Sequence, residues 1–154
     1  MFTGRHYHTI DAKGRVAIPH RFRDELSKGT GKVVITHSWP PRTIRSLDLM
    51  PIDEYERQLE ELKKKIPDGP EKIRYVDALM VGYAHPAQEV CFDSQGRILV
   101  PPPHREYARL KRNVVTTGDV DKVRLWAAEE YEKNLESVTE FGENSKELAS
   151  LLLL

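Results

Sequence analysis

The sequence of 154 residues lacks several features that secreted and membrane-spanning proteins need. It has one cysteine, Cys91, so no disulfide can form within the chain. No apolar stretch approaches the roughly 20 residues that cross a bilayer, and no leader with a basic start and an apolar centre opens the chain. These absences predict a reduced, cytoplasmic protein without a membrane partner. Cys91 lies in a strand-like run, where we expect it to be buried as a small hydrophobic side chain.

The sequence also lacks the motifs of common catalytic, cofactor and metal sites. It has no glycine-rich loop of the P-loop or Rossmann type, and nothing around Cys91 predicts a nucleophile. His6 and His8 would share one face of a strand, but the remaining histidines have no companion cysteine and no ligand spacing. We therefore expect no enzymatic activity, no cofactor and no metal.

Charge is balanced over the whole chain but unevenly distributed. The 24 basic and 24 acidic residues give a net charge of zero, which does not by itself predict a nucleic-acid binder. Residues 1–28 carry six basic against three acidic residues, and residues 91–113 carry five against two, so each segment has a net charge of +3. A molecule that is basic on one face suits DNA binding, and ordinary charge scatter is the alternative explanation.

One motif of nine residues occurs twice, 82 positions apart. Asp11-Ala-Lys-Gly-Arg-Val-Ala-Ile-Pro19 matches Asp93-Ser-Gln-Gly-Arg-Ile-Leu-Val-Pro101, with the Asp, Gly, Arg and Pro identical. Farther on, residues 49–55 match residues 125–131 at an offset of 76, so the first copy has a longer connection, which we place between residues 36 and 47. A repeat over this distance implies duplication of one structural unit.

The residue types of the motif predict its local structure. The aspartate can cap a tight turn, the glycine supplies a positive φ, and the arginine that follows presents its guanidinium from that turn. The apolar run suits a buried strand, and the proline can open a helix. The residues of the two turns are Asp11, Lys13, Gly14 and Arg15 in the first copy and Asp93, Gln95, Gly96 and Arg97 in the second.

The two motif arginines are the strongest candidates for a binding function. Arg15 and Arg97 could contact phosphate or pair with a guanine edge in the major groove of DNA. Lys13 adds a cation that Gln95 replaces, so the first turn should bind phosphate more strongly and the second should contribute more hydrogen bonding. The alternative is that each arginine only forms a salt bridge with the aspartate of its own turn. The two interpretations are compatible if the aspartate orients the arginine.

Three further arginines of the first copy are secondary candidates, for which a solvated or core-edge role is as good an explanation: Arg5, Arg21 and Arg23.

Apolar periodicity and turn residues predict the remaining elements. We expect Phe2 to be a packing anchor, and Gly82 with Pro86 to end a helix that joins the two copies. The tail 142–154 could be disordered or could pack on another subunit, and the cost of exposed leucines favours contact. Helices are expected at 19–27, 52–66, 70–83, 102–110 and 128–138, and strands at 5–10, 32–36, 46–50, 114–117 and 122–126.

At this point the chain resembles the MraZ family. The resemblance covers roughly residues 1–138. It rests on Met1-Phe-Thr-Gly4, the two Asp-x-x-Gly-Arg turns, Pro19-x-x-Phe-Arg23 and Pro101-Pro-x-x-Arg-Glu-Tyr107. It implies an α+β fold in which two swapped-hairpin half-units of SpoVT-AbrB type form a pseudo-twofold β-barrel module with flanking helices. The implied domains are repeat 1 at 5–53, a helical connection at 54–85, repeat 2 at 86–128, and a C-terminal helix and tail at 129–154.

The resemblance also implies a function. It implies a cytoplasmic, nucleoid-associated regulator that binds double-stranded DNA at direct repeats in the promoter of the division and cell-wall gene cluster, usually as a repressor. It implies homo-oligomeric rings of about eight subunits. The DNA-facing motif positions would be Lys13, Arg15 and Arg97, with Asp11 and Asp93 alongside. Two alternatives stay open: an AbrB-like antitoxin-type regulator, against which two full repeats in one chain argue, and a scaffold protein that does not bind DNA.

Overall fold

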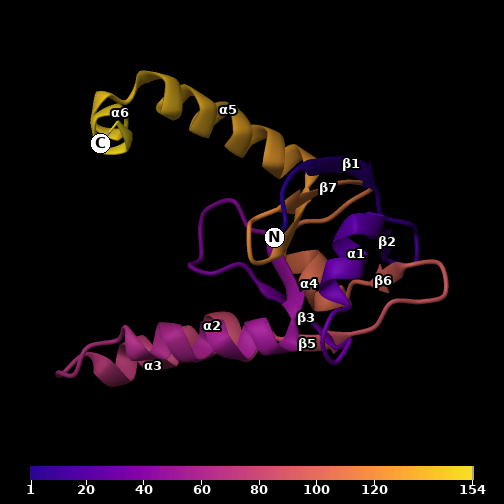
Figure 1. Cartoon of the computed structure of the whole chain (residues 1–154), viewed down its shortest axis with the longest axis horizontal. Coiled ribbons are helices and arrows are strands. Elements are labelled where there is room, and N and C mark those ends of the chain that lie inside the picture. Colours follow the sequence, from indigo (N-terminus) through magenta and orange to yellow (C-terminus); the bar gives the residue numbers. More distant parts are fainter. Residues whose placement is uncertain (154) are drawn as a thin grey trace.

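The computed structural model describes residues 1–153. Its main elements come in two successive sets that have the same order (Figure 1). That order is strand, strand, helix, strand, strand, helix. The first set is β1 (Arg5–Thr9), β2 (Arg15–Ala17), α1 (His20–Leu26), β3 (Val33–His37), β4 (Leu47–Pro51) and α2 (Ile52–Lys64). The second is β5 (Gln88–Val90), β6 (Arg97–Leu99), α4 (Pro102–Tyr107), β7 (Asn113–Gly118), β8 (Val123–Ala127) and α5 (Ala128–Asn144). Between them lie α3 (Lys72–Leu79) and the π-helical η1 (Met80–Ala84), and α6 (Lys146–Leu152) comes last.

All the strands pair antiparallel, and many pairs join one half of the chain to the other. The large sheet has the order β1-β7-β8-β4-β3-β5, and β2 pairs with β6 in a separate ribbon. Thus β1 pairs with β7, β5 with β3 and β4 with β8, so each of these ladders combines a strand from each half. The predicted α+β class is confirmed. In residues 1–153 the sheet ends at β1 and β5, so the expected closed barrel is not observed.

The core forms because β-branched and apolar residues alternate inward on these strands. Val33 and Ile35 of β3 and Val114 of β7 are completely buried. Phe2 packs edge-to-face on Phe22 of α1, with ring centroids 5.8 Å apart, and is buried as expected. The connection between β3 and β4 covers residues 38–46 and that between β7 and β8 covers 119–122, so the longer loop lies where the shift in offset placed it.

The helix between the two halves ends differently from the prediction. Gly82 lies inside η1 rather than at its end, and the indole of Trp39 covers the position that a Cβ would occupy there. The Tyr83 carbonyl accepts hydrogen bonds from the hydroxyls of Thr36 at 2.7 Å and Tyr55 at 3.2 Å. These side-chain bonds accompany the wider π-helical turn, so the last turn of the helix is anchored to the sheet.

The expectation for Cys91 is corrected, whereas for the tail the structure shows helix and its contact with another subunit stays a prediction. Cys91 is exposed, because β5 stops pairing with β3 at Val90 and the chain then leaves the sheet. The tail is helical up to Leu152: α5 continues to Asn144, and Ser145 caps α6 by accepting a hydrogen bond from the Leu148 N–H at 3.0 Å. Leu154, which the sequence analysis grouped with this tail, lies outside the described residues.

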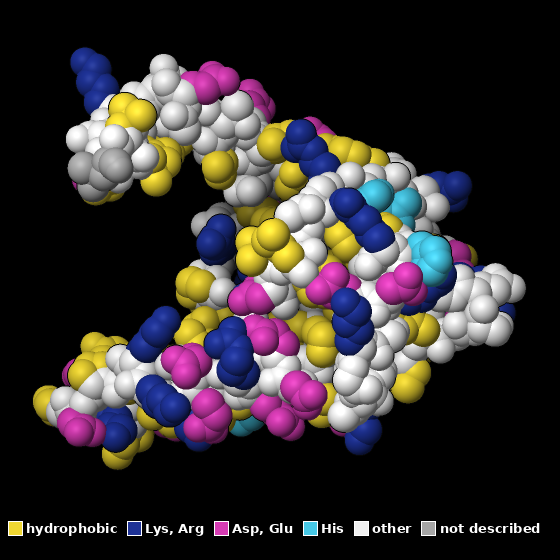
Figure 2. All heavy atoms as spheres, in the orientation of Figure 1, with side chains coloured by type: hydrophobic (Ala, Val, Ile, Leu, Met, Phe, Trp, Pro, Cys, Tyr) yellow, Lys and Arg dark blue, Asp and Glu magenta, His cyan; other side chains and the backbone are white. Residues whose placement is uncertain are grey.

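The helices outside the sheet form two projections. Figure 1 shows α2 with α3 extending from one side of the sheet and α5 with α6 from another. Figure 2 shows a hollow between the two projections. In the described part of the chain no helix is both long enough and apolar enough to cross a membrane.

A buried ion pair joins the two halves at the centre of the large sheet. Asp48 of β4 lies opposite Arg124 of β8, and Nε of Arg124 donates to Oδ1 of Asp48 at 2.8 Å. The Asp48 and Arg124 side chains are 1% and 11% exposed. Ser38 donates a further hydrogen bond to Asp48 at 2.6 Å. Removing one partner of such a pair leaves the other charge buried without compensation.

We predict that Asp48→Ala lowers the free energy of unfolding by about 3–5 kcal/mol, measured by urea denaturation at one protein concentration. Lys72→Ala is the control. It removes the exposed Asp68–Lys72 pair at 2.7 Å and should change the free energy by less than about 1 kcal/mol. Equal effects of the two substitutions would show that the buried pair does not hold the halves together.

Candidate nucleic-acid interface

The two motif turns have the same hydrogen-bond network. In the first turn (residues 11–15) the Asp11 carboxylate accepts from the backbone N–H groups of Lys13 at 3.0 Å and Arg15 at 2.9 Å. In the second turn (residues 93–97) the Asp93 carboxylate accepts from Gln95 and Arg97, both at 2.9 Å. The aspartates therefore cap the turns, as predicted.

Positive φ angles are also found where the sequence predicts them. Gly14 has φ of 87° and Gly96 has φ of 73°, a region that costs a residue with a side chain about 1 kcal/mol or more. The close match between the two turns follows from the shared Asp-x-x-Gly-Arg sequence.

Each aspartate also fixes the direction of its arginine. Nε of Arg15 donates to Oδ2 of Asp11 at 2.7 Å, and Nε of Arg97 donates to Oδ2 of Asp93 at 2.8 Å. The salt bridge weighed as an alternative therefore exists in both turns. In both arginines only Nε makes this contact. Nη1 and Nη2 carry no hydrogen bond to any residue that the structure describes. The two arginine side chains are 32% and 26% exposed, so these amino groups can reach a ligand.

The turns lie at opposite ends of the β2–β6 ribbon. In its register Arg15 is opposite Leu99 and Arg97 is opposite Ala17. The Ile18 N–H donates to the Gly96 carbonyl at 3.3 Å, and the Val100 N–H donates to the Gly14 carbonyl at 2.9 Å. Each turn is therefore tied to the strand of the other copy. In Figure 1 the ribbon lies at the end of the molecule opposite the tips of the two helical projections.

Two arginines that the sequence analysis did not place in the turns lie directly against them. The Arg105 guanidinium from α4 covers Gly14, and the Arg23 guanidinium from α1 covers Gly96, where an added Cβ would overlap each group. The equal offset of Arg23 and Arg105 in the repeat was a usable signal that they are equivalent. Which turn each arginine covers depends on the pairing of β2 with β6, which joins the two halves of the chain.

The other candidates divide into exposed and structural residues. Lys13 and Gln95 are exposed at matching places in the two turns. Arg5 donates to the Tyr131 hydroxyl at 3.1 Å, and Arg21 donates to the Thr3 carbonyl and lies over the Phe22 ring. Arg5 and Arg21 therefore hold the N-terminal segment and α5 in place.

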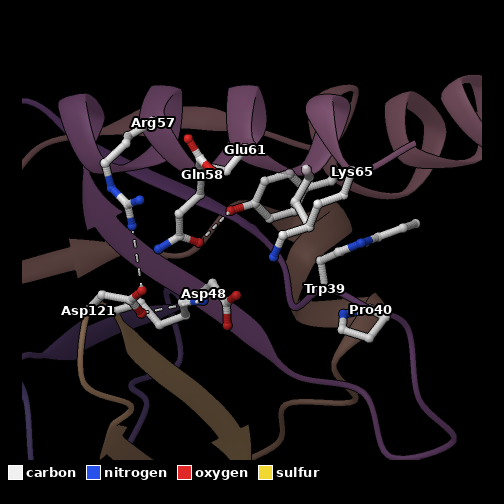
Figure 3. A pocket seen from close by; sticks show the side chains of 11 residues that line it. Trp39, Pro40, Asp48, Arg57, Gln58, Glu61, Lys65 and Asp121 are labelled. Atoms are coloured by element: carbon white, nitrogen blue, oxygen red, sulfur yellow. Dashed lines mark hydrogen bonds and ion pairs between the residues drawn. The ribbon is translucent and has the colours of Figure 1, made fainter. Parts of the chain in front are cut away.

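A cavity of about 460 Å³ lies away from the turns (Figure 3). Trp39 and Pro40 of the 38–46 loop form one wall and α2 forms another. Arg57 is paired with Glu54 at 2.6 Å and with Asp121 at 3.9 Å, so its charge is compensated locally. This makes the cavity a poorer phosphate site than the turns. Within residues 1–153 no group of three His, Cys, Asp or Glu side chains is placed to hold a metal ion.

The turn carboxylates are held in their charged form. The hydrogen bond from the Arg15 backbone N–H, followed by that from its side chain, lowers the pKa of Asp11 against the opposing effect of burial. The Arg97 backbone N–H does the same for the pKa of Asp93. Because these pKa values lie below the unfolded value of about 3.9, the carboxylates stabilise the fold above that pH. The contribution is lost as the pH falls through the lowered pKa values.

We predict that Asp11→Asn/Asp93→Asn flattens the acid limb of the stability curve. The free energy of unfolding, measured by urea denaturation between about pH 5 and pH 2, should fall less in the variant than in the wild type. Carbon-13 NMR titration of the two carboxyl groups should give pKa values below the usual one for aspartate. Parallel stability curves for the two proteins would contradict the role of these hydrogen bonds.

Comparison with known proteins identifies the family. The chain matches the model of a family described as "MraZ protein, putative antitoxin-like" over residues 1–68 and 84–152. It is 38% identical over 153 residues to the Transcriptional regulator MraZ of Shewanella baltica strain OS155, covering 97% of this chain and 94% of that protein. The proteins of the same name from Shewanella amazonensis and Pseudomonas putida strain F1 are 36% and 33% identical over 89% and 99% of this chain, and the matches cover 86% and 100% of those proteins.

These relatives are named as regulators rather than enzymes, in agreement with the expectation of no enzymatic activity. The extent of both matches shows that the chain belongs to the MraZ family of transcriptional regulators.

Proposed function

We propose that this chain regulates transcription by binding double-stranded DNA through its two Asp–Arg turns. The observation that carries the proposal is the orientation of Arg15 and Arg97. Each is fixed through Nε by an aspartate and keeps both Nη groups free of partners among the described residues. A guanidinium held in this way has little conformational entropy to lose when it meets phosphate or the O6 and N7 atoms of guanine.

The paired ends of the β2–β6 ribbon support contact with one duplex by both turns. Antiparallel pairing gives the ribbon a local twofold relation, so both turns can meet the same face of DNA. We propose that this pairing reflects a swapped-hairpin exchange between repeat 1 (5–53) and repeat 2 (86–128). The site would then comprise Lys13, Arg15, Gln95 and Arg97, with Asp11, Asp93, Gly14 and Gly96 shaping the turns.

The family suggests the target. Direct repeats in the promoter of the division and cell-wall gene cluster are the proposed operator, repression is the proposed outcome, and the cytoplasm and nucleoid are the proposed location. The antitoxin-like description of the family keeps an AbrB-like antitoxin as a second candidate. A scaffold that does not bind DNA is the third.

A ring of subunits would explain how a chain of zero net charge binds DNA. One subunit offers few phosphate contacts, whereas several subunits on adjacent repeats gain affinity through effective concentration. The two helical projections, α2 with α3 and α5 with α6, expose the apolar surface that such assembly needs. Ile73 is 76% exposed on α3, Phe141 is 62% exposed on α5, and Leu152 is 75% exposed on α6.

We predict that Arg15→Ala/Arg97→Ala abolishes preference for direct-repeat DNA. Fluorescence anisotropy should show salt-sensitive wild-type binding to the repeat duplex over a scrambled one. The double variant should bind the repeat duplex about 30-fold or more weakly, since each bidentate base contact is worth about 1–3 kcal/mol. Arg42→Ala/Arg74→Ala, which removes two exposed arginines outside the turns, should keep the preference. Equal affinity of the wild type for both duplexes would leave only generic phosphate binding. If the assembled wild type did not bind DNA even at low salt, the result would favour a scaffold function without DNA binding.

We predict that the chain sediments as a homo-oligomer at micromolar concentration and that Phe141→Glu shifts it to smaller species, because a charge placed in an apolar contact is costly. Thr139→Glu places the same charge on the opposite side of α5 and should leave the sedimentation coefficient unchanged. A wild-type protein that is only monomeric at this concentration would exclude the ring.

A further inference from the structure

A basic groove lies beside the first turn and is built from both halves of the chain. A cavity of about 330 Å³ is lined on one side by Ile10, Asp11 and Ala12. Its other side is formed by Arg105, Leu110, Lys111 and Arg112 of the second half. A neighbouring hollow shares Arg105, Leu110 and Lys111, so the concave surface continues toward the start of α4. We call this surface, with its cations Arg105, Lys111 and Arg112, the basic groove.

The chain around the groove is held firmly. The Ile10 N–H donates to the Arg112 carbonyl at 2.9 Å, directly beyond the β1–β7 ladder. The Arg105 guanidinium covers Gly14, and the Leu110 N–H donates to the Arg105 carbonyl at 2.9 Å. The cations of the groove are therefore carried on a backbone that is fixed relative to the first turn.

The charge of the groove is not compensated locally. Lys111 and Arg112 are exposed and form no ion pair or side-chain hydrogen bond within residues 1–153. The carboxylate of Asp11 is already bound to Arg15. Glu106 lines only the neighbouring hollow. Arg109 also lines the neighbouring hollow, but its charge is compensated by Glu130 at 3.6 Å. A concave surface with excess positive charge beside an oriented arginine is suited to the phosphates of a nucleic-acid backbone.

The two turns differ in the charge of the connection beside them. The connection from α4 to β7 carries Arg109, Lys111 and Arg112, whereas the corresponding connection from α1 to β3 carries Lys28 and Lys32 around Gly29-Thr30-Gly31. Within the turns, Gln95 stands where the first copy has Lys13. Arg23 and Arg105 cover the two glycines alike, so the difference between the ends comes from these exposed positions. The first turn therefore has more unpaired positive charge beside it than the second: Lys13, Lys111 and Arg112 against Lys28 and Lys32.

We propose that the basic groove binds backbone phosphates next to the bases that Arg15 contacts, and that each subunit thereby binds DNA with a fixed polarity. This inference rests on the proposed DNA-binding function. The two turns of a subunit are related by an approximate twofold axis but differ in charge. This difference also explains why the subunit would prefer direct to inverted repeats. A symmetric pair of turns would bind a repeat equally well in either direction, whereas a groove at one end favours one direction.

The test compares the salt dependence of binding to the direct-repeat duplex by fluorescence anisotropy. Lys111→Ala/Arg112→Ala should reduce the slope of log K against log salt by about 1.8 per bound subunit and keep the preference for repeats over scrambled DNA. The charge-preserving Lys111→Arg/Arg112→Lys variant should keep the wild-type slope. Lys63→Ala/Lys64→Ala removes the same charge from the far end of α2 and should also keep it, once sedimentation shows unchanged assembly.

Polarity is tested with duplexes in which methylphosphonates replace phosphates on one flank of each repeat. Neutral phosphates on one flank should weaken wild-type binding more than those on the other, and Lys111→Ala/Arg112→Ala should remove this difference. Equal weakening by the two flanks, or an unchanged slope in the variant, would overturn the inference while the proposed function stands. Failure of the wild type to bind the repeat duplex would overturn both.

Discussion

The pairing of β2 with β6 is the constraint on which the rest of the site depends. A ribbon of three residues per strand is too short to be stable in water by itself. It persists because Val16 and Ile98, which face each other in the register, are buried in the core together with Ile18 and Val100. Arg15 and Ala17 point the other way, as the period of a strand requires. Core packing beneath the ribbon therefore sets the position of both guanidiniums above it, and a change in the core should move them without altering either turn.

The structure contains two kinds of Asp–Arg pair with different consequences. The Asp48–Arg124 pair is buried where β4 meets β8, so losing one partner would leave a charge in a low-dielectric environment. The Asp11–Arg15 and Asp93–Arg97 pairs are partly exposed, and pairs of that kind contribute little to the free energy of unfolding. Their main effect is to restrict an arginine to one direction. The same two residue types thus join the halves of the molecule in one place and prepare a binding surface in another.

Local features of this chain could be predicted from the sequence, and long-range ones could not. The turns were predictable because their hydrogen bonds span four residues or fewer. The contact of Arg105 with Gly14 spans 91 positions and depends on the pairing of β2 with β6 across the two halves. The exposure of Cys91 depends on where β5 stops pairing, and the indole that covers Gly82 comes from Trp39 in a distant loop. The leucines of α6 were ambiguous because a short apolar run has no clear helical period.

Net charge says little about binding here because it averages over surfaces with separate roles. Acidic residues open α2 and α5 near the helix N-termini, where they interact favourably with the helix dipole, and they lie away from the turns. Basic residues collect near the β2–β6 ribbon, and the crossed strands bring Arg105, Lys111 and Arg112 of the second half to the turn of the first. Because the Debye length is about 8 Å at physiological ionic strength, distant carboxylates do little to cancel this local charge. A neutral chain can therefore present a surface with the potential of a basic one, and the residues that differ between the two copies, such as Lys13 and Gln95, make the charge of its two ends unequal.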